Sequence, residues 1–252
     1  ADQINTNIHA LWGRMAPPPT VPESAAAWSN QCAAWTDGLR AKCFAGWPAD
    51  PGPLDAKRAY AGKAGSLRIE AWDFRSQAEV PLRLYVMRTS SRRSSVRLHI
   101  ADGAGLSPTN RPAAGPNADV AEALAAAGCS SAADLEPRLA DGTALAVFVP
   151  RHLGLTACSG DAKRQTQIRR RFMLLGQTVD GMRVWDIRRA LQTLRGMKEY
   201  AATPLTLAGR GEQGVNALYA SLFEPGIAAL DLSELPASHM QGPDYLNVLK
   251  VL

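Results

Sequence analysis

The sequence has no apolar run long enough to cross a membrane, because its most apolar stretch, residues 143–150, is only as long as a strand. Basic residues are not gathered into one face either. The net charge of +5 comes largely from Arg92-Arg93 and Arg169-Arg170-Arg171, rather than from a basic surface interleaved with aromatic residues. We therefore expect neither a membrane nor nucleic acid as a partner. The 252 residues, 46% of them hydrophobic, are enough to bury one substantial core.

Cysteine is scarce, and its spacing excludes the common CxxC metal and redox motifs. The order of the four cysteines allows two disulfides, Cys32 with Cys43 and Cys129 with Cys158, and equally allows four isolated buried thiols. The first residue, Ala1, fits either a processed terminus or an arbitrary boundary. The compartment stays open and leans toward an exported or periplasmic protein. We expect no cofactor.

The N-terminal quarter differs in composition from the rest of the chain. Residues 1–65 are rich in Pro, Ala, Gly and Trp, with one helix expected at 23–45. We interpret this segment as an arm that packs on a body formed by residues 66–252. Four tryptophans are expected to anchor the arm by packing: Trp12, Trp28, Trp35 and Trp47.

Strands and helices alternate in the body. Segments 66–74 and 80–88 flank a polar turn and predict an antiparallel hairpin. Further strands are expected at 95–101, 144–149, 205–208 and 227–232, and helices at 117–127, 178–194 and 214–223. This order predicts a mostly parallel sheet of about six strands with helices on both faces, because parallel neighbours need crossover helices. Functional groups then belong at the carboxyl ends of the strands.

Polar residues follow those strand ends, where catalytic sites of parallel sheets are assembled. The set contains Gly103, Arg151, His152, Arg210, Gly211, Glu212, Gln213, Glu234, Ser238 and His239. A satisfied structural role is the alternative for each histidine taken singly. The glycine turn 209–214 precedes a helix, so its backbone donors suit an anion or oxyanion, although tight strand-to-helix packing explains the same glycines.

Four stretches in the second half carry a family resemblance. They are RRRFMLLG at 169–176, MRVWD at 182–186, the glycine turn at Gly209, and LPASHMQGP at 235–243. With the order of elements, they make residues 66–252 similar to the α/β-hydrolase superfamily, in its bacterial acetyl-xylan-esterase-like branch. The resemblance implies a three-layer α/β/α sandwich and hydrolysis of an ester, carried by a small molecule or a carbohydrate.

Two departures from the family pattern concern its serine triad. The superfamily elbow reads GxSxG, but Gly211 stands at the serine position and Gln213 at the second glycine. The family also places its acid after a seventh strand and its histidine after an eighth, whereas the expected elements here end after the sixth. The resemblance therefore does not carry serine-triad catalysis to this chain.

Two hypotheses follow from these departures. In the first, the strand ends form a different catalytic set: Glu212 is the general base or nucleophile, His239 the acid or base, Ser238 a nucleophile or donor, and His152 a further histidine. Developing negative charge is then held by Arg151 and Arg210 and by the turns at Gly103, Gly211 and Gln213. A metal held by Glu212, Glu234, His152 and His239 is a variant of this hypothesis, without an HExxH spacing to support it. In the second, the chain is a noncatalytic binding or structural lobe.

The incomplete sheet also predicts an association. If the strand at 227–232 lies at an open edge of the sheet, its unpaired backbone groups favour pairing with another chain. We therefore expect a homodimer through this edge.

Overall fold

The computed structural model describes residues 8, 11, 13–15, 20–89, 94–106, 108, 118–139, 141–158, 161–239 and 241–245. The chain forms two compact units, Ala1–Leu39 and Arg40–Leu252. In the first unit, Trp28 and Trp35 on helix α2 (Ala25–Lys42) make a T-shaped ring contact, with centroids 6.0 Å apart. About half of each of these two tryptophans is exposed. The predicted packing role is therefore not confirmed for Trp28 and Trp35. Trp12 lies outside the described residues.

The larger unit contains a seven-stranded sheet in the order β1-β2-β3-β5-β4-β6-β7. The strands are β1 (Lys57–Ala64), β2 (Leu67–Gln77), β3 (Val80–Arg88), β4 (Ser95–Ile100), β5 (Thr143–Phe148), β6 (Leu205–Arg210) and β7 (Ala229–Ser233). From β1 through β2 and β3 to β5 neighbours pair antiparallel, and from β5 through β4 and β6 to β7 they pair parallel. The sheet is thus mixed, not mostly parallel, because the hairpin strand β3 joins β5 antiparallel.

Strand β1 is the element that the expected six strands lacked. It pairs with β2 from Lys57 to Ala64, so part of the predicted arm belongs to the sheet. Its residues are exposed or half-buried, and its sequence KRAYAGKA has no alternation of large apolar and polar residues. A strand at the edge of a sheet needs no such alternation, since little of it is buried.

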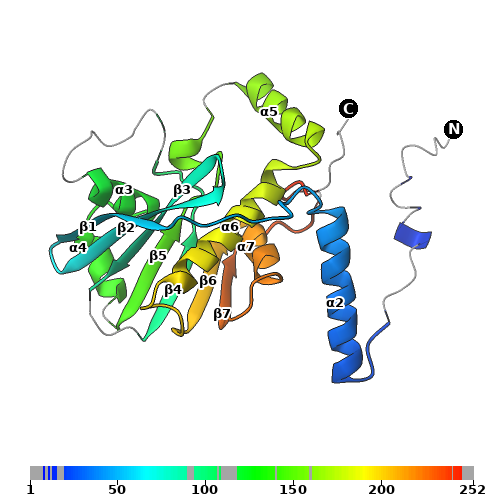
Figure 1. Cartoon of the computed structure of the whole chain (residues 1–252), viewed down its shortest axis with the longest axis horizontal. Helices are drawn as coiled ribbons and strands as arrows, with labels where there is room; N and C mark the ends of the chain where they lie inside the picture. The colour runs from blue at the N-terminus through cyan, green and yellow to red at the C-terminus, as the bar shows by residue number, and fades with distance from the viewer. Residues whose placement is uncertain are drawn as a thin grey trace. The chain divides into compact units, whose positions relative to one another are not determined.

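Helices cover both faces of the sheet and complete a three-layer sandwich. They are α3 (Ala118–Ala126), α4 (Ala132–Leu135), α6 (Val179–Gly196) and α7 (Gly211–Ser221), whereas α5 (Ala162–Leu174) has no buried residue. Figure 1 shows α6 crossing the sheet with α7 beside it. The helices expected at 117–127, 178–194 and 214–223 are confirmed as α3, α6 and α7, with Asn117 outside the described residues. None of the described helices is long and apolar enough to span a bilayer.

Alternation along the strands supplies the two layers of core. In β5, Leu145 and Val147 join the core cluster that α3 contributes to, whereas Ala146 and Phe148 are fully buried on the opposite side. Such burial on both faces is typical of a central strand. Phe148 there contacts Phe74 of β2, with ring centroids 5.7 Å apart.

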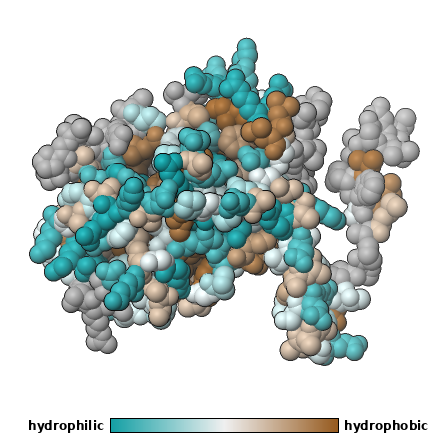
Figure 2. Space-filling model, in the orientation of Figure 1, coloured by the Kyte–Doolittle hydropathy of each residue, from teal (hydrophilic) through white to brown (hydrophobic). Residues whose placement is uncertain are grey.

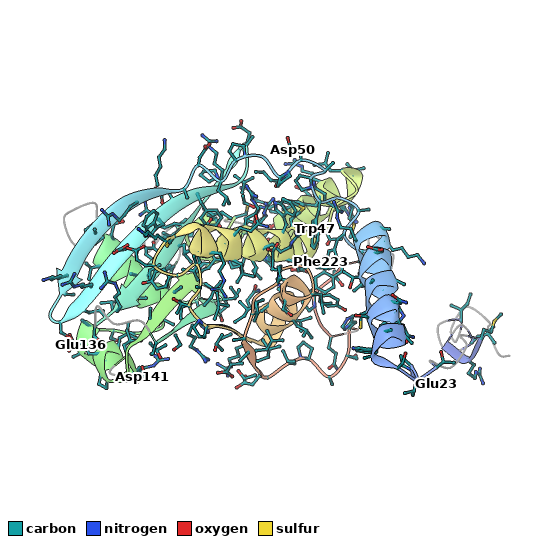
Figure 3. All side chains as sticks on the ribbon, turned by 60° about the horizontal axis from the view of Figure 1, so that its bottom comes forward. Glu23, Trp47, Asp50, Glu136, Asp141 and Phe223 are labelled. Atoms are coloured by element: carbon teal, nitrogen blue, oxygen red, sulfur yellow. The ribbon has the colours of Figure 1, made fainter. Side chains whose placement is uncertain are left out.

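The segment before β1 is held by aromatic packing. Trp47, only 4% exposed, donates its indole N–H to the Gly181 carbonyl at 2.7 Å and stacks on Phe44 at 4.4 Å. Its ring also meets Phe223 edge-on at 4.9 Å (Figure 3). The packing role predicted for the tryptophans is therefore confirmed at Trp47. Helix α6 begins nearby at its N-cap Thr178, whose Oγ1 accepts the Gly181 N–H at 2.9 Å.

Candidate active site at the carboxyl ends of the strands

The parallel strands β4, β6 and β7 end beside one cavity, which we call the rim cavity. It has a volume of about 490 Å³ and is lined by His99, Ile100, Asp102, Leu153, Arg210, Gly211, Glu212, Gln213 and Glu234. Parallel strands bring their carboxyl ends to the same edge of a sheet, which is why residues from four separate turns, including the turn after β5, meet there. Four of the residues predicted for catalysis or binding line this cavity together: Arg210, Gly211, Glu212 and Gln213.

The turn from β6 into α7 places one residue with positive φ between a strand and a helix. Gly211 has φ +56°, in the left-handed region, at the position where the family places its serine. A Cβ on Gly209 would lie 2.9 Å from the Cα of Gly214, and a Cβ on Gly214 would lie 2.7 Å from the Leu235 side chain. Close packing of the strand on the helix therefore explains Gly209 and Gly214, and backbone conformation explains Gly211.

Charged groups surround the start of α7. Arg210 and Glu234 form an ion pair at 2.5 Å, with both side chains more than 60% exposed. Glu212 lies in the first turn of α7 and is exposed. The free N–H groups of this turn give the helix end a partial positive charge that favours a carboxylate or an oxyanion. Gln213 is buried instead, and its Oε1 accepts a hydrogen bond from Asn216 Nδ2 at 3.2 Å.

His99 of β4 contributes an imidazole to the same cavity. Burial, with smaller contributions from the charges of Arg97 and Arg138, lowers the pKa of His99 below its usual value. The ring is therefore held neutral near pH 7 and has one nitrogen free to accept a hydrogen bond. In the sequence His99 falls one residue short of the strand end, and only the side-chain direction in the folded strand shows that it lines the cavity.

Ser238 and His239 do not line the rim cavity. His239 Nε2 lies 2.5 Å from the Tyr219 hydroxyl oxygen, and its ring packs against Tyr219 and Tyr245. Ser238 is exposed and its carbonyl accepts the Gln241 N–H at 3.1 Å. The predicted convergence of Glu212 and His239 on one cavity is thus wrong, because the chain after β7 carries His239 to Tyr219, about two turns further along α7 than Glu212.

Arg151 forms a buried ion pair and does not line the rim cavity. Its guanidinium donates to both carboxylate oxygens of Asp186 on α6, at 2.8 and 2.6 Å, and to Ser76 Oγ of β2 at 3.3 Å. The Ser76 hydroxyl in turn donates to Asp186 at 2.5 Å, and the Asp186 side chain is fully buried. This buried network joins β2, α6 and the turn after β5, and Arg151 is not among the groups that line the rim cavity.

The glycine turn after β4 serves packing. Gly103 has φ +74°, and a Cβ there would lie 2.5 Å from the backbone nitrogen of Gly154. The turns after β4 and β5 therefore touch through two glycines, and Gly103 does not line the rim cavity. Gly103 therefore allows the two loops to pack closely together.

The described part of the chain contains no arrangement of side chains that supports the metal hypothesis. No group of three or more His, Cys, Asp or Glu side chains there is placed to hold a metal ion. Glu212 and Glu234 share the rim cavity, but His152 and His239 do not line it. His152 instead lies with Nδ1 3.0 Å from the sulfur of Cys158. All four cysteines are half-buried free thiols, so neither predicted disulfide is formed and none of the thiols is fully buried.

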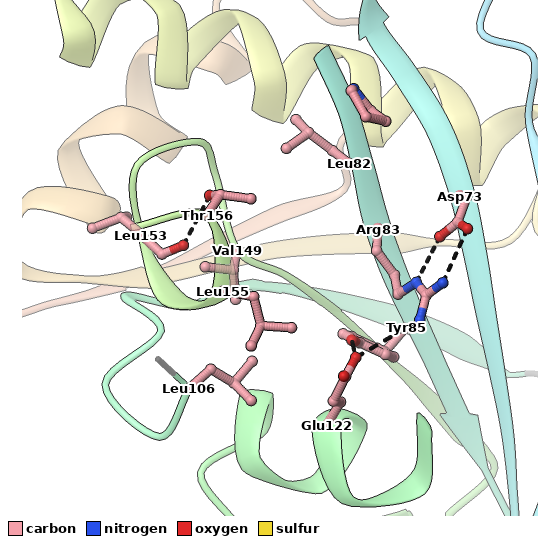
Figure 4. Close-up of a pocket in the computed structure, with 11 residues that line it drawn as sticks. Asp73, Leu82, Arg83, Tyr85, Leu106, Glu122, Val149, Leu153, Leu155 and Thr156 are labelled. Carbon is pink, nitrogen blue, oxygen red and sulfur yellow. Dashed lines mark hydrogen bonds and ion pairs between the residues drawn. The ribbon is translucent and has the colours of Figure 1, made fainter. Parts of the chain in front are cut away.

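A second cavity lies on the other side of Leu153, which lines both. We call it the Tyr85 cavity; its volume is about 380 Å³, and Leu82, Leu106, Val149 and Leu155 give it apolar walls. Figure 4 shows a polar cluster at one end. There Arg83 binds Asp73 through two hydrogen bonds of 2.6 and 3.0 Å, and the Tyr85 hydroxyl donates to Glu122 at 2.7 Å.

Sequence reasoning missed this cluster, because its residues lie within strands and a helix and not after strand ends. Asp73 and Arg83 are directly opposite each other in the β2–β3 register, and Glu122 comes from α3. Burial and the hydrogen bond to Glu122 raise the pKa of Tyr85 well above its usual value. The phenol is therefore a permanent hydrogen-bond donor in the physiological range.

Comparison with known proteins gives likeness in structure only. No protein-family model and no curated protein matches the chain. Among solved structures, a candidate acetyl xylan esterase from Bacteroides fragilis superposes with a TM-score of 0.63 at 12% identity, over 90% of this chain and 59% of that one. A glucuronoyl esterase from Solibacter usitatus gives 0.56 at 17% identity, over 85% and 63%. One from Teredinibacter turnerae gives 0.53 at 15%, over 84% and 52%.

The chain thus spans between about half and two thirds of each of these esterases. The superpositions cover 84% to 90% of the present chain. At these identities the likeness concerns the backbone and not the side chains of a site. The fold is accordingly that of the α/β hydrolases, in the form found in acetyl xylan esterases and glucuronoyl esterases.

Proposed function

We propose that this chain hydrolyses an ester, with an acylated carbohydrate as the substrate class, at the rim cavity and without a serine nucleophile. One observation carries the proposal: the Glu212 carboxylate, the neutral His99 imidazole and the backbone donors at the start of α7 line the same cavity. The position of this cavity, at the elbow of a hydrolase fold, supports it. The chemistry of the esterases with this fold supports the choice of an ester.

The chemistry of each group gives it a role. Glu212 is the general base, which takes a proton from a water molecule that attacks the ester carbonyl. The oxyanion receives hydrogen bonds from the free N–H groups of the first turn of α7, and Arg210 adds positive charge beside it. When the tetrahedral intermediate collapses, the C–O bond breaks and the alkoxide takes up the proton that Glu212 holds. His99 accepts a hydrogen bond from the substrate or the water.

The Tyr85 cavity is suited to the remainder of such a substrate. It adjoins the rim cavity at Leu153 and combines leucine and valine walls with the carboxylates of Asp73 and Glu122. Apolar walls with a few fixed polar groups are the usual composition of a small-molecule site. Carboxylates accept hydrogen bonds from hydroxyl groups, and an acylated sugar presents several of these beside its ester.

Gly211 favours a second candidate function, a noncatalytic binding lobe. The residue at the nucleophile position has no side chain, so the elbow retains the geometry of a hydrolase without its reactive group. In this case the two cavities bind a carbohydrate ester and release it unchanged. The two candidates differ in one measurable property, turnover.

Turnover of an ester panel tests the proposal. The panel contains aryl acetates, acetylated xylo-oligosaccharides and glucuronoyl esters, each with and without a chelator. Glu212→Gln should lower kcat by about 10² to 10⁴ fold, the usual contribution of a general base. Glu79→Gln, the same change in the exposed β2–β3 turn, should leave kcat unchanged.

His239→Ala tests whether residues outside the rim cavity take part in catalysis. Unchanged kcat fits catalysis in the rim cavity alone, whereas a loss equal to that of Glu212→Gln would return His239 and its neighbour Ser238 to the mechanism. Turnover that Glu212→Gln does not lower would remove Glu212 as the base. If no ester is turned over while isothermal titration detects binding of the oligosaccharides, the chain is a binding lobe.

A further inference from the structure

The turn after β5 brings a thiol and an imidazole together outside the rim cavity. Nδ1 of His152 lies 3.0 Å from the sulfur of Cys158, and Cys158 is half-buried. The ring of His152 is fixed by an edge-on contact with Phe172 of α5, at 5.3 Å between centroids. Gln165 of α5 donates to the Cys158 carbonyl at 2.9 Å and so holds the backbone of the cysteine.

His152 is held in an unusual conformation. Its φ is +59°, in the left-handed region that residues with a Cβ seldom adopt. Arg183 donates to the His152 carbonyl at 3.4 Å, and burial, with the charges of Arg183 and Arg151, lowers the pKa of His152. The imidazole is thus neutral near pH 7, and the nitrogen that faces the sulfur can accept a proton.

A cavity with excess positive charge opens beside Cys158. It measures about 460 Å³ and is lined by Cys158, Asp161, Lys163, Arg164, Gln167, Ile168 and Arg171. Figure 2 shows hydrophilic side chains beside a hydrophobic patch over α5, the helix that supplies most of this lining. Arg164, Ile168 and Arg171 are spaced i, i+4, i+7 and so face the same side of α5. Within the described residues, none of the three cations of the lining is ion-paired.

The single carboxylate of the lining does not neutralise these charges. Asp161 is the N-cap of α5, and its side chain accepts the Arg164 N–H at 2.9 Å. Three cations that line the same cavity as the thiol attract a reacting partner that carries an anionic group. Reactive cysteines lie beside basic groups of this kind, whereas buried structural cysteines are inert.

We propose that Cys158 and His152 form a nucleophile–base pair that reacts with anionic acyl donors, namely activated esters bearing a carboxylate or phosphate. His152 Nδ1 takes the thiol proton, and the sulfur attacks the carbonyl carbon. An S–C bond forms, the ester C–O bond breaks, and the leaving alkoxide takes up the proton from His152. Cys158 is left as a thioester. The site does not line the rim cavity, so this inference does not rest on the proposed role of Glu212.

Alkylation with a charged and a neutral reagent tests the thiol itself. Iodoacetate and iodoacetamide differ only in the carboxylate, and peptide mass spectrometry measures the rate at each cysteine of the intact chain. Cys129 is the internal control: it too is half-buried and near a cation, Arg138, at 3.7 Å, but its sulfur lies beside the Ala127 carbonyl and not beside a histidine. The ratio of the iodoacetate rate to the iodoacetamide rate should be about tenfold higher at Cys158 than at Cys129.

Matched variants separate the imidazole from the charges. His152→Asn keeps a residue that tolerates positive φ and should slow both reagents at Cys158 by about tenfold or more. Arg164→Gln with Arg171→Gln should lower only the iodoacetate rate, and Arg170→Gln, on the same helix but outside the cavity, should change neither. Equal rates at Cys158 and Cys129, or no loss in His152→Asn, would overturn the pair.

Acylation tests the substrate class. The 4-nitrophenyl monoester of glutaric acid and 4-nitrophenyl butyrate are an anionic and a neutral acyl donor of similar size. In the Glu212→Gln background, the anionic ester should release one equivalent of nitrophenol and leave a glutaryl thioester on Cys158, detected by mass spectrometry. Acylation of Cys158 at equal rates by both esters, or none by either, would contradict the anionic class, whatever the outcome at the rim cavity.

Discussion

Removing the negative charge of Asp186 should destabilise the larger unit strongly. Asp186 is fully buried and accepts hydrogen bonds from the guanidinium of Arg151, from its backbone N–H at 3.1 Å, and from the Ser76 hydroxyl. In Asp186→Asn the Arg151 guanidinium, whose side chain is only 9% exposed, loses its counter-charge and faces an amide donor. Breaking a buried pair in this way costs about 3 to 5 kcal/mol, because a buried charge is left uncompensated.

Urea unfolding measures this loss. With a denaturant slope of about 3 kcal/mol per M, the midpoint should fall by about 1 to 1.7 M. Asp231→Asn is the matched control, since Asp231 pairs with Arg97 at the surface, where more than half of the Asp231 side chain is exposed. An exposed pair contributes at most about 1 kcal/mol, so this midpoint should hardly move.

A double variant separates the lost pair from the stranded charge. If the uncompensated guanidinium causes the loss, adding Arg151→Met to Asp186→Asn removes it, and the double variant is no less stable than Asp186→Asn alone. Equal midpoints for Asp186→Asn and Asp231→Asn would refute the reasoning. So would a further large loss in the double variant.

Two further predictions concern Tyr85 and strand β7. The pKa of Tyr85 is raised in the folded chain, chiefly by burial, so its stabilisation is complete below the unfolded value near 10 and is lost as pH rises above it. The free energy of unfolding should therefore fall above about pH 10, and in Tyr85→Phe the fall should be shallower by up to about 1.4 kcal/mol per pH unit; parallel curves would contradict this. Strand β7 pairs only with β6 among the described strands, and Leu230 on it is 42% exposed. Sedimentation should show a dimer that Leu230→Lys dissociates, and a wild-type monomer at all concentrations would exclude pairing through this edge.

The sequence predicts those elements whose local pattern and tertiary environment agree. The hairpin, the buried strand β5 and helix α6 fall within a few residues of their expected bounds, because each carries an apolar period that its burial requires. Strand β1 and helix α5 were not predicted. Strand β1 is an edge strand without apolar alternation, and α5, with no buried residue, has no apolar face that the core would impose. Their positions depend on tertiary contacts.

The candidate site was predictable in part for the same reason. The turn after β6 can be found from a strand, a glycine turn and a helix, and its residues do line the rim cavity. Which other side chains join them depends on directions that spacing does not encode. His99 turns into the cavity from within a strand, whereas His239 lies beside Tyr219. Arg151 follows a strand end, where a substrate clamp is expected, but its guanidinium binds the buried carboxylate of Asp186, thirty-five residues further along the chain.

The elbow shows why this fold does not by itself imply its usual chemistry. Gly209 and Gly214 are required by the close approach of β6 to α7, and this packing would be needed whether or not a nucleophile stood between them. Gly211 has the positive φ of the turn without strain, since it lacks a Cβ. The conformation of this turn therefore needs no side chain at position 211. Under the proposed function, ester hydrolysis at the rim cavity therefore depends on side chains beside the elbow, and Glu212 is the carboxylate that the first turn of α7 presents to the cavity.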